Sequence, residues 1–344
     1  MRFQRIISTI DSHTEGEPTR VVVGGVPVIP GATFQDKWEW AKANLDDLRK
    51  LLVFEPRGHS VMSGSIITTP CTPGADVGVI YIETSGFLPM CGHGTIGTCT
   101  VLVEAGLVPV TEPVTRLTLD TPAGLVRAAV TVVDGVAQDV TIQNVPAFLY
   151  RADLTVQVPG LGPVVLDIAY GGNFYAIVPA RAVGLELVPA QAREIVEVAN
   201  RIREAIFEQV EVVHPLIPAI ARCSHVRFTS PSPTPGVTTR NAVLYSAEAI
   251  DRSPCGTGTC AEMACRHAKG LLALDQDFVS ESIIGSLFTG RLAEETSVGR
   301  YPAVVPTIRG SAYVSGINQL VLDPRDPFPS GFFLGKSSRW GAEF

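Results

Sequence analysis

A motif repeated at long range constrains the fold of this 344-residue chain more than any other feature of its sequence. Cys255 lies 164 residues after Cys91, and both cysteines open the pattern Cys-Gly-x-Gly-Thr. The same shift superimposes other residues on both sides of the motif: Gly92 on Gly256, Gly94 on Gly258, Thr95 on Thr259, Gly106 on Gly270, and residues 79–81 on 243–245. We therefore predict an internal duplication that builds two similar domains.

Each copy has the pattern of a buried strand, a short connection, the cysteine motif, a helix of small and apolar residues, and a glycine that ends the helix. Helical periodicity also predicts helices over 190–208 and 36–52, the second with Trp40, Leu45, Leu48 and Leu52 on its buried face. Runs of β-branched residues bounded by Gly and Pro predict strands at 20–28, 77–82, 117–119, 125–133, 164–168, 174–178, 226–229 and 242–246. The fold class is therefore α/β, or α+β, and rich in strands.

Charge and cysteine usage exclude several classes of protein. The net charge is −7 and neither sign forms a long run, so neither nucleic acid nor an anionic membrane is an expected partner. Residues 1–18 lack the apolar core of a signal peptide, and the longest charge-free window, 84–103, is broken by Gly and Pro. The seven cysteines form no CxxC pair. We therefore expect a cytoplasmic protein with free thiols and no membrane span.

A thiol placed just before a helix lies where unpaired backbone N–H groups and the positive end of the helix dipole converge. This field favours the thiolate, so we expect the pKa of Cys91 and Cys255 to be lowered. The same N–H groups suit a substrate carboxylate, and the glycines let a ligand approach the backbone closely.

Two such sites that face each other across a domain cleft have a specific chemical use. Inversion of a stereocentre next to a carboxylate needs one base on one face and one acid on the other. A thiolate and a thiol, Cys91 and Cys255, serve both roles, and the helix N–H groups stabilise the charge that develops on the carboxylate. No cofactor is implied, because the sequence has neither a phosphate-binding loop nor a dinucleotide fingerprint.

Three simpler roles for these cysteines are compatible with the motif alone. They are packing in the core, a disulfide between Cys91 and Cys255, and metal ligation by Cys91 with His93 or by Cys223 with His225. No metal site is predicted, since zinc ligands more often follow other spacings. His93 stands where the second copy has Thr257, and next to Cys91 we expect it to contact substrate. Asp251 precedes Cys255 and would serve as the counter-ion of a substrate amine.

Several long motifs also resemble the proline racemase superfamily, and within it the 4-hydroxyproline 2-epimerases. They run in order along nearly the whole chain: DSHTEGEPTR (11–20), EPRGH (55–59), MCGHGTIG (90–97), YGGNFY (170–175), DRSPCGTGT (251–259), SIIGSLF (282–288) and DPRDPF (323–328). The resemblance implies a diaminopimelate-epimerase-like fold, with two pseudo-symmetric domains, each a sheet wrapped around a central helix, and the active site in the cleft between them. We place the domains at 1–150 and 151–310, with 311–344 packing back on the first.

The resemblance also implies roles for individual residues. Cys91 and Cys255 correspond to the acid/base pair. Substrate-binding positions are implied at Gly92, His93, His225, Asp251, Gly256 and Thr257, with Asp251 holding the ring nitrogen and His225 a second polar contact. Related 3-hydroxyproline dehydratases keep the first cysteine but have Thr or Ser at the second, whereas this chain has both.

The predicted function is epimerisation at Cα of 4-hydroxyproline, between the trans-L and cis-D forms, by a cofactor-independent two-cysteine mechanism. The alternatives are a 3-hydroxyproline epimerase, a proline racemase, a dehydratase, or a ligand- or metal-binding protein that keeps the fold. The only predicted partner is the small-molecule substrate. The oligomeric state is left open, with a homodimer as the candidate.

Overall fold

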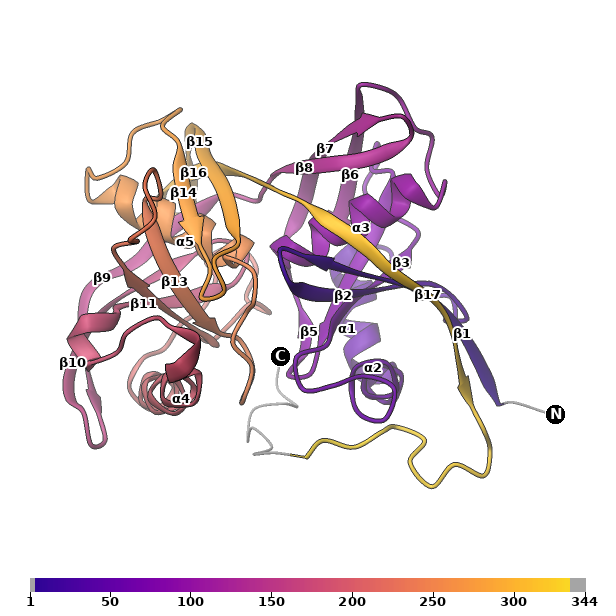
Figure 1. The fold of residues 1–344 in the computed structure, drawn as a ribbon, viewed down its shortest axis with the longest axis horizontal. Coiled ribbons are helices and arrows are strands. Elements are labelled where there is room, and N and C mark those ends of the chain that lie inside the picture. Colours follow the sequence, from indigo (N-terminus) through magenta and orange to yellow (C-terminus); the bar gives the residue numbers. More distant parts are fainter. Residues whose placement is uncertain (1–3, 335–344) are drawn as a thin grey trace. The chain divides into compact units, whose positions relative to one another are not determined.

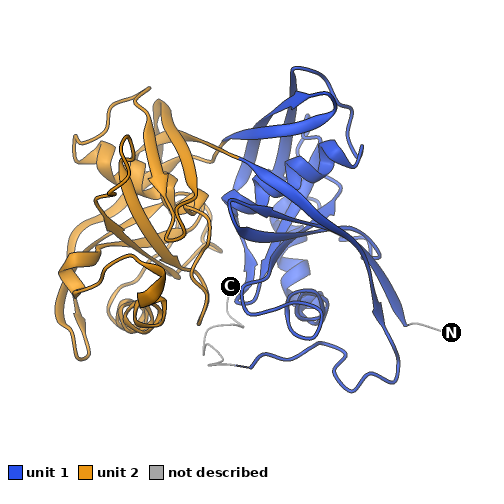
Figure 2. Cartoon of the chain, viewed as in Figure 1, with its two compact units in different colours: residues 1–142, 311–344 blue, residues 143–310 orange. Residues whose placement is uncertain are grey.

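The structure, a computed structural model, describes residues 4–334. The chain divides into two compact units, which Figure 2 colours separately. Unit 1 comprises 1–142 and 311–344, and unit 2 comprises 143–310. The sequence predicts the first boundary at 150, but strand β9 (Ala147–Val158) crosses that point and belongs wholly to unit 2.

Unit 1 is a sheet whose strands come from both ends of the chain (Figure 1). Its elements are β1 (Arg5–Thr14), β2 (Glu17–Gly24), α1 (Phe34–Asn44), α2 (Asp46–Val53), β3 (Ser63–Thr68), β4 (Val77–Glu83), β5 (Gly86–Leu88), α3 (Gly92–Glu104), β6 (Val114–Thr121), β7 (Gly124–Val133), β8 (Val136–Gln143) and β17 (Ala312–Leu322). β1 pairs antiparallel with both β2 and β17, while β2–β3 and β4–β6 are parallel pairs. Burial alternates along β7, so one face of this strand packs on the core.

Helix α3 lies in the core of unit 1. All of its residues from Gly92 to Val103 are buried, and it contacts β1, β2, β3, β7 and β17. A helix that is apolar or small-sided all round is typical of such a position.

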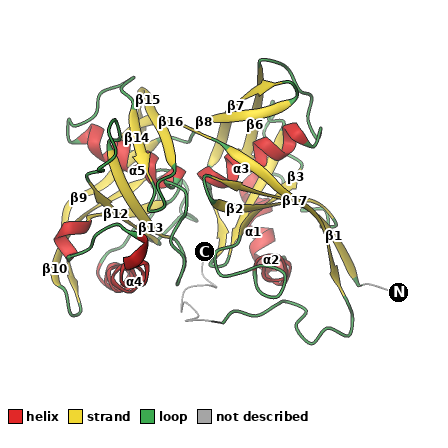
Figure 3. Cartoon of the chain, viewed as in Figure 1, coloured by secondary structure: helices red, strands yellow, loops and turns green. Residues whose placement is uncertain are grey.

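Unit 2 is a ring of strands around a second buried helix. Its elements are β9, β10 (Gly162–Tyr170), β11 (Phe174–Pro179), two short 3₁₀ turns (Ala180–Val183, Pro189–Gln191), α4 (Ala192–Gln209), β12 (His225–Ser230), β13 (Thr239–Leu244), α5 (Gly256–Ala268), β14 (Phe278–Glu281), β15 (Leu287–Val298) and β16 (Tyr301–Gly310). Each strand pairs with the next along the chain, and β16 returns to pair with β9. Helix α5 contacts β9, β10, β11, β15 and β16. The predicted architecture, a sheet wrapped around a central helix in each unit, is confirmed (Figure 3).

The two central helices have the same length and end in the same way. Gly106 and Gly270 follow them with φ of 63° and 70°, a backbone conformation that glycine adopts without strain. The Leu107 N–H then donates to the Leu102 carbonyl at 2.9 Å, and the Leu271 N–H to the Arg266 carbonyl at 2.7 Å. The predicted glycine stop of both copies is therefore confirmed.

The single helix predicted over 36–52 is wrong, because the chain forms two helices there. Leu45, with φ of −116° and ψ of 11°, separates α1 from α2. Asp46 in the first turn of α2 pairs with both Arg49 and Lys50, which supports a new helix start at this point. Trp38 is buried in the core, whereas Trp40, which was predicted on the buried face, is only half-buried.

Within the described residues, no helix is both long and apolar enough to cross a membrane.

Candidate active site

Cys91 is the residue from which helix α3 starts. Its backbone is extended, with φ of −140° and ψ of 114°, and its side chain is buried. The first hydrogen bond of the helix runs from the Thr95 N–H to the Cys91 carbonyl at 2.9 Å, and no side chain caps the helix start. The N–H groups in the first turn of α3 precede this bond, so they have no carbonyl acceptor within the helix. They lie beside the sulfur of Cys91.

His93 lies against the sulfur of Cys91. Its Nδ1 is 3.5 Å from Cys91 Sγ, and its Nε2 is 2.8 Å from Ser63 Oγ. Because the Ser63 hydroxyl donates to the Pro18 carbonyl at 2.6 Å, His93 Nε2 must be the donor to Ser63. In a neutral imidazole the other ring nitrogen is then an acceptor, so Nδ1 can accept a hydrogen bond from the Cys91 thiol, while Nε2 itself lies 3.7 Å from Cys91 Sγ.

Cys255 starts helix α5 with a different backbone. Its φ of 62° is rare for any residue other than glycine, and such a conformation costs about 1 to 3 kcal/mol where it is enforced. The Cys255 N–H donates to Ser253 Oγ at 3.1 Å. The Ser253 N–H and hydroxyl in turn donate to Asp251 Oδ1 at 2.8 and 2.7 Å. Asp251 thus fixes the turn that presents Cys255.

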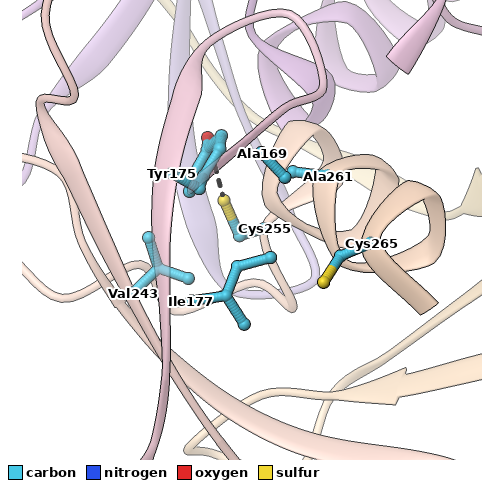
Figure 4. Close-up of a cluster of buried hydrophobic side chains, with 7 residues drawn as sticks. All are labelled: Ala169, Tyr175, Ile177, Val243, Cys255, Ala261 and Cys265. Atoms are coloured by element: carbon cyan, nitrogen blue, oxygen red, sulfur yellow. Dashed lines mark hydrogen bonds between the residues drawn. The ribbon is translucent and has the colours of Figure 1, made fainter. Parts of the chain in front are cut away.

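Tyr175 on β11 contacts the sulfur of Cys255, as Figure 4 shows. Its hydroxyl is 3.4 Å from Cys255 Sγ and 2.6 Å from Thr257 Oγ1. Asn173 Nδ2 donates to the same Thr257 oxygen at 3.4 Å. The sequence motif at 170–175 contains this tyrosine, but its contact with Cys255 was not predicted.

A buried ion pair lies behind the start of α5. Arg227 on β12 donates from Nε to Glu262 Oε2 and from NH1 to the Pro254 carbonyl, at 2.9 and 3.0 Å. Both side chains are almost completely buried. The arginine thus brings a positive charge to the residue that precedes Cys255. Arg227 was not predicted either, since a lone arginine in a strand gives no signal of this role.

The pKa of Cys255 is raised, whereas the sequence predicted that the helix start would lower it. Burial is the largest cause, and the nearby Asp251 carboxylate adds to it. The Arg227 charge, the Tyr175 hydroxyl and the Gly258 N–H act in the opposite direction but do not outweigh these effects. The prediction is therefore wrong for Cys255, because the cost of a buried charge exceeds the stabilisation from the helix end.

The second glycine of each motif makes room for a sulfur. A Cβ on Gly94 would lie 3.0 Å from Cys91 Sγ, and a Cβ on Gly258 would lie 2.9 Å from Cys255 Sγ. Separations this short are rare for ordinary side chains, so the glycines permit each thiol to fold back over its helix.

His225 lies beside Tyr175, with the two rings 4.9 Å apart, and its Nδ1 is 2.7 Å from Ser224 Oγ. Burial and the Arg203 charge lower the pKa of His225 to about 3, so its imidazole is neutral at physiological pH. Unit 2 therefore brings Cys255, Thr257 and His225 together around Tyr175. Asp251 joins them through the turn at Ser253, and Gly256 is the first residue of α5.

Unit 1 brings together Cys91, Gly92 and His93, which are consecutive at the start of α3. All seven cysteines are free, and Cys71 is partly exposed. Among the described residues, no group of three or more His, Cys, Asp or Glu side chains is placed to hold a metal ion.

Comparisons with known proteins cover nearly the whole chain. A 4-hydroxyproline 2-epimerase from Streptosporangium roseum is 57% identical over 97% of this chain and 100% of its own length. A proline racemase from Clostridioides difficile is 48% identical over 97% of this chain and 100% of its own length. A crystal structure of a hydroxyproline epimerase from Agrobacterium vitis, with bound trans-4-hydroxy-L-proline, superimposes with a TM-score of 0.93. It is 38% identical and covers 100% of this chain and 99% of that one.

The family model described as proline racemase matches residues 9–333, a range that includes both cysteine motifs and the strands that surround each central helix. With whole-length relatives at 48 to 57% identity, this match establishes the relationship. The chain belongs to the proline racemase family.

Proposed function

We propose that this protein epimerises 4-hydroxyproline at Cα, interconverting trans-4-hydroxy-L-proline and cis-4-hydroxy-D-proline. The observation that carries the proposal is the 57% identity to a 4-hydroxyproline 2-epimerase along the whole length of both chains. The hydroxyproline bound to the similar Agrobacterium vitis enzyme supports the same substrate.

In this mechanism Cys91 and Cys255 are the acid and the base. One sulfur, as a thiolate, takes the Cα proton from one face of the ring carbon, and the other, as a thiol, delivers a proton to the opposite face. The two sulfurs exchange roles when the reaction runs in reverse. The raised pKa of Cys255 suits the role of the thiol that delivers a proton, while His93 Nδ1 is placed to accept a hydrogen bond from the Cys91 thiol.

The helix starts hold the substrate carboxylate. The N–H groups of Gly92 and His93 in one unit, and of Gly256 and Thr257 in the other, supply donors where negative charge develops on the carboxylate during proton removal. Asp251 accepts a hydrogen bond from the ring nitrogen. His225, neutral because of its burial, offers a polar contact without adding charge.

The mechanism also requires that both sulfurs stay reduced. All seven cysteines are free thiols in the structure, which is the state that a reducing compartment maintains. We propose a cytoplasmic location, because a two-thiol mechanism needs a compartment that keeps both sulfurs reduced. A homodimer remains the candidate assembly, and the geometry described above does not depend on it.

Chiral chromatography tests the substrate directly. Incubation with trans-4-hydroxy-L-proline should produce cis-4-hydroxy-D-proline, and in D₂O the inverted product should carry deuterium at Cα, because a thiol exchanges its proton with solvent. Parallel incubations with L-proline and 3-hydroxyproline determine the preference. Product without deuterium, or no turnover of 4-hydroxyproline, would contradict the proposal.

Proline is the second candidate substrate, since a proline racemase is 48% identical over its whole length. Faster turnover of L-proline than of 4-hydroxyproline would favour that assignment. Faster turnover of 3-hydroxyproline in the same assay would favour a 3-hydroxyproline epimerase. A dehydratase is disfavoured because this chain has cysteine at both motif positions.

We predict that Asp251→Asn lowers kcat/KM for 4-hydroxyproline by about ten- to a hundredfold. The variant loses the charge-assisted hydrogen bond to the ring nitrogen, while the amide oxygen can still accept from Ser253. Steady-state kinetics measures the loss. A competitive carboxylate inhibitor of similar shape that lacks the ring nitrogen should bind the variant nearly as well as the wild type.

Ser253→Ala is the matched control for this prediction. It removes the hydroxyl that joins Asp251 to the Cys255 N–H but leaves the carboxylate in place. If Ser253→Ala reproduces the loss, or if the inhibitor is weakened as much as the substrate, Asp251 acts through the turn and the amine assignment is wrong.

A further inference from the structure

Tyr175 is the one side chain whose hydroxyl the structure places, within the described residues, against both Cys255 Sγ and Thr257 Oγ1. The tyrosine is fully buried, and its ring packs in the core beside Ala169, Ile177 and Val243 (Figure 4). Its position is therefore fixed by packing, and the hydroxyl can rotate only about its own C–O bond.

The neighbours of the hydroxyl form a short chain, from Cys255 through Tyr175 and Thr257 to Asn173. The two ends of the chain differ in chemistry. The Asn173 Nδ2 group donates to Thr257 Oγ1, whereas the sulfur of Cys255 accepts as a thiolate and donates as a thiol. The two hydroxyls between them each carry one hydrogen and can point it either way.

We propose that Tyr175 is a catalytic residue whose hydroxyl reverses its hydrogen bond to serve Cys255 in both of its protonation states. This inference rests on the proposed function, in which Cys255 alternates between thiolate and thiol. Tyr175 lies on β11, outside both cysteine motifs.

The hydrogen bonds of the two states differ in direction. Beside a thiolate, the Tyr175 hydroxyl donates to Cys255 Sγ and accepts from the Thr257 hydroxyl. When Cys255 has taken the Cα proton, its S–H donates to the Tyr175 oxygen, the Tyr175 hydrogen turns to Thr257 Oγ1, and the Thr257 hydrogen turns away from Tyr175. No O–H bond breaks, so the only proton that moves is the one between the substrate carbon and the sulfur.

The charged groups near Cys255 cannot reverse their interaction with the sulfur as the Tyr175 hydroxyl can. Asp251 favours the thiol, and Arg227, held by Glu262, favours the thiolate, each with a fixed charge. Burial raises the pKa of Tyr175 well above its ordinary value, so the phenol stays protonated throughout. A neutral hydroxyl that reorients is therefore the only contact of this sulfur, among those described, that can favour either state.

The test is Tyr175→Phe, which removes the hydroxyl and keeps the ring. The pH dependence of iodoacetamide alkylation, followed by mass spectrometry of the Cys255 peptide, should give a thiol pKa for Cys255 about one to two units higher than in the wild type. The Cys91 peptide is the internal reference and should not shift. We expect kcat/KM for 4-hydroxyproline to fall by about ten- to a hundredfold in both directions, since the overall equilibrium fixes their ratio.

Tyr170→Phe is the matched control. Tyr170 is a second fully buried tyrosine in unit 2, and its hydroxyl has no hydrogen-bond partner in the described part of the chain. It should leave both the alkylation profile and kcat/KM unchanged. A second variant, with 3-fluorotyrosine at position 175, preserves packing and makes the hydroxyl a stronger donor, so the thiol pKa of Cys255 should fall.

The results separate this inference from the proposed function. An unchanged Cys255 titration in Tyr175→Phe, or one matched by Tyr170→Phe, would overturn the role of Tyr175 even if the wild type epimerises 4-hydroxyproline. A wild type that does not epimerise would overturn the proposed function, while the alkylation profile would still report on the hydrogen bond.

Discussion

Cys91→Ser and Cys255→Ser are each expected to lose epimerisation almost completely. A serine hydroxyl is a far poorer base than a thiolate at neutral pH, and general acid–base catalysis contributes about 10²- to 10⁴-fold to a rate. Both serine variants keep the size and shape of the side chain, so the helix starts should be preserved. Chiral chromatography of 4-hydroxyproline after incubation with each variant measures the residual inversion.

Cys260→Ser is the control for these variants. Cys260 is a buried thiol on the same helix as Cys255 but lies one turn further along, so it tests whether any loss of a buried sulfur impairs the enzyme. It should keep most of the wild-type activity. If either Cys91→Ser or Cys255→Ser kept more than about a tenth of the wild-type rate, the two-thiol mechanism would be wrong.

Cys255→Thr should separate the two halves of the reaction. Inversion should fall by about 10²- to 10⁴-fold, because no thiol remains to deliver a proton to the second face. Cys91 is unchanged and should still remove the Cα proton from one epimer and return it to the same face. Proton NMR in D₂O should therefore detect Cα–H exchange on one epimer, with little of the other formed.

The backbone at Cys255 affects how this variant is assessed. Threonine is β-branched and is poorly suited to a φ of 62°. Cys255→Thr therefore strains the backbone more than Cys255→Ser does. Circular dichroism and a thermal unfolding curve for both variants show whether the fold is retained. Normal inversion by a folded Cys255→Thr protein would exclude Cys255 as the second acid/base.

The duplication is visible in the sequence, so two similar domains could be predicted from it, whereas the sheet wrapped around each central helix was predicted from the family resemblance. Cys91, Cys255 and the glycines that end both helices recur at one spacing, and each copy implies the same strand, helix and stop. The split between α1 and α2 was missed because a continuous apolar period does not reveal that Leu45 leaves the helical conformation.

The surroundings of each thiol could be predicted only in part. His93 and Asp251 lie within four residues of a cysteine, so local sequence indicated them. Tyr175 and Arg227 reach Cys255 from strands that precede it by 80 and 28 residues, and no local pattern reports such a pairing. The pKa of Cys255 was predicted with the wrong sign, because it depends on how deeply the side chain is buried, which the motif does not specify.

The discontinuity of unit 1 determines the order in which the chain can fold. Strand β1 pairs with β17 along nearly its whole length, yet about 300 residues of chain separate the two strands. During synthesis, unit 2 is complete as one continuous segment and can close its ring of strands before β17 emerges. Until then, the backbone N–H and C=O groups on one edge of β1 stay unpaired and exposed. Long-range pairing of this kind is also slow. A released fragment that ends at Gly310, and so lacks β17, should therefore protect unit 2 from protease while leaving unit 1 open to cleavage.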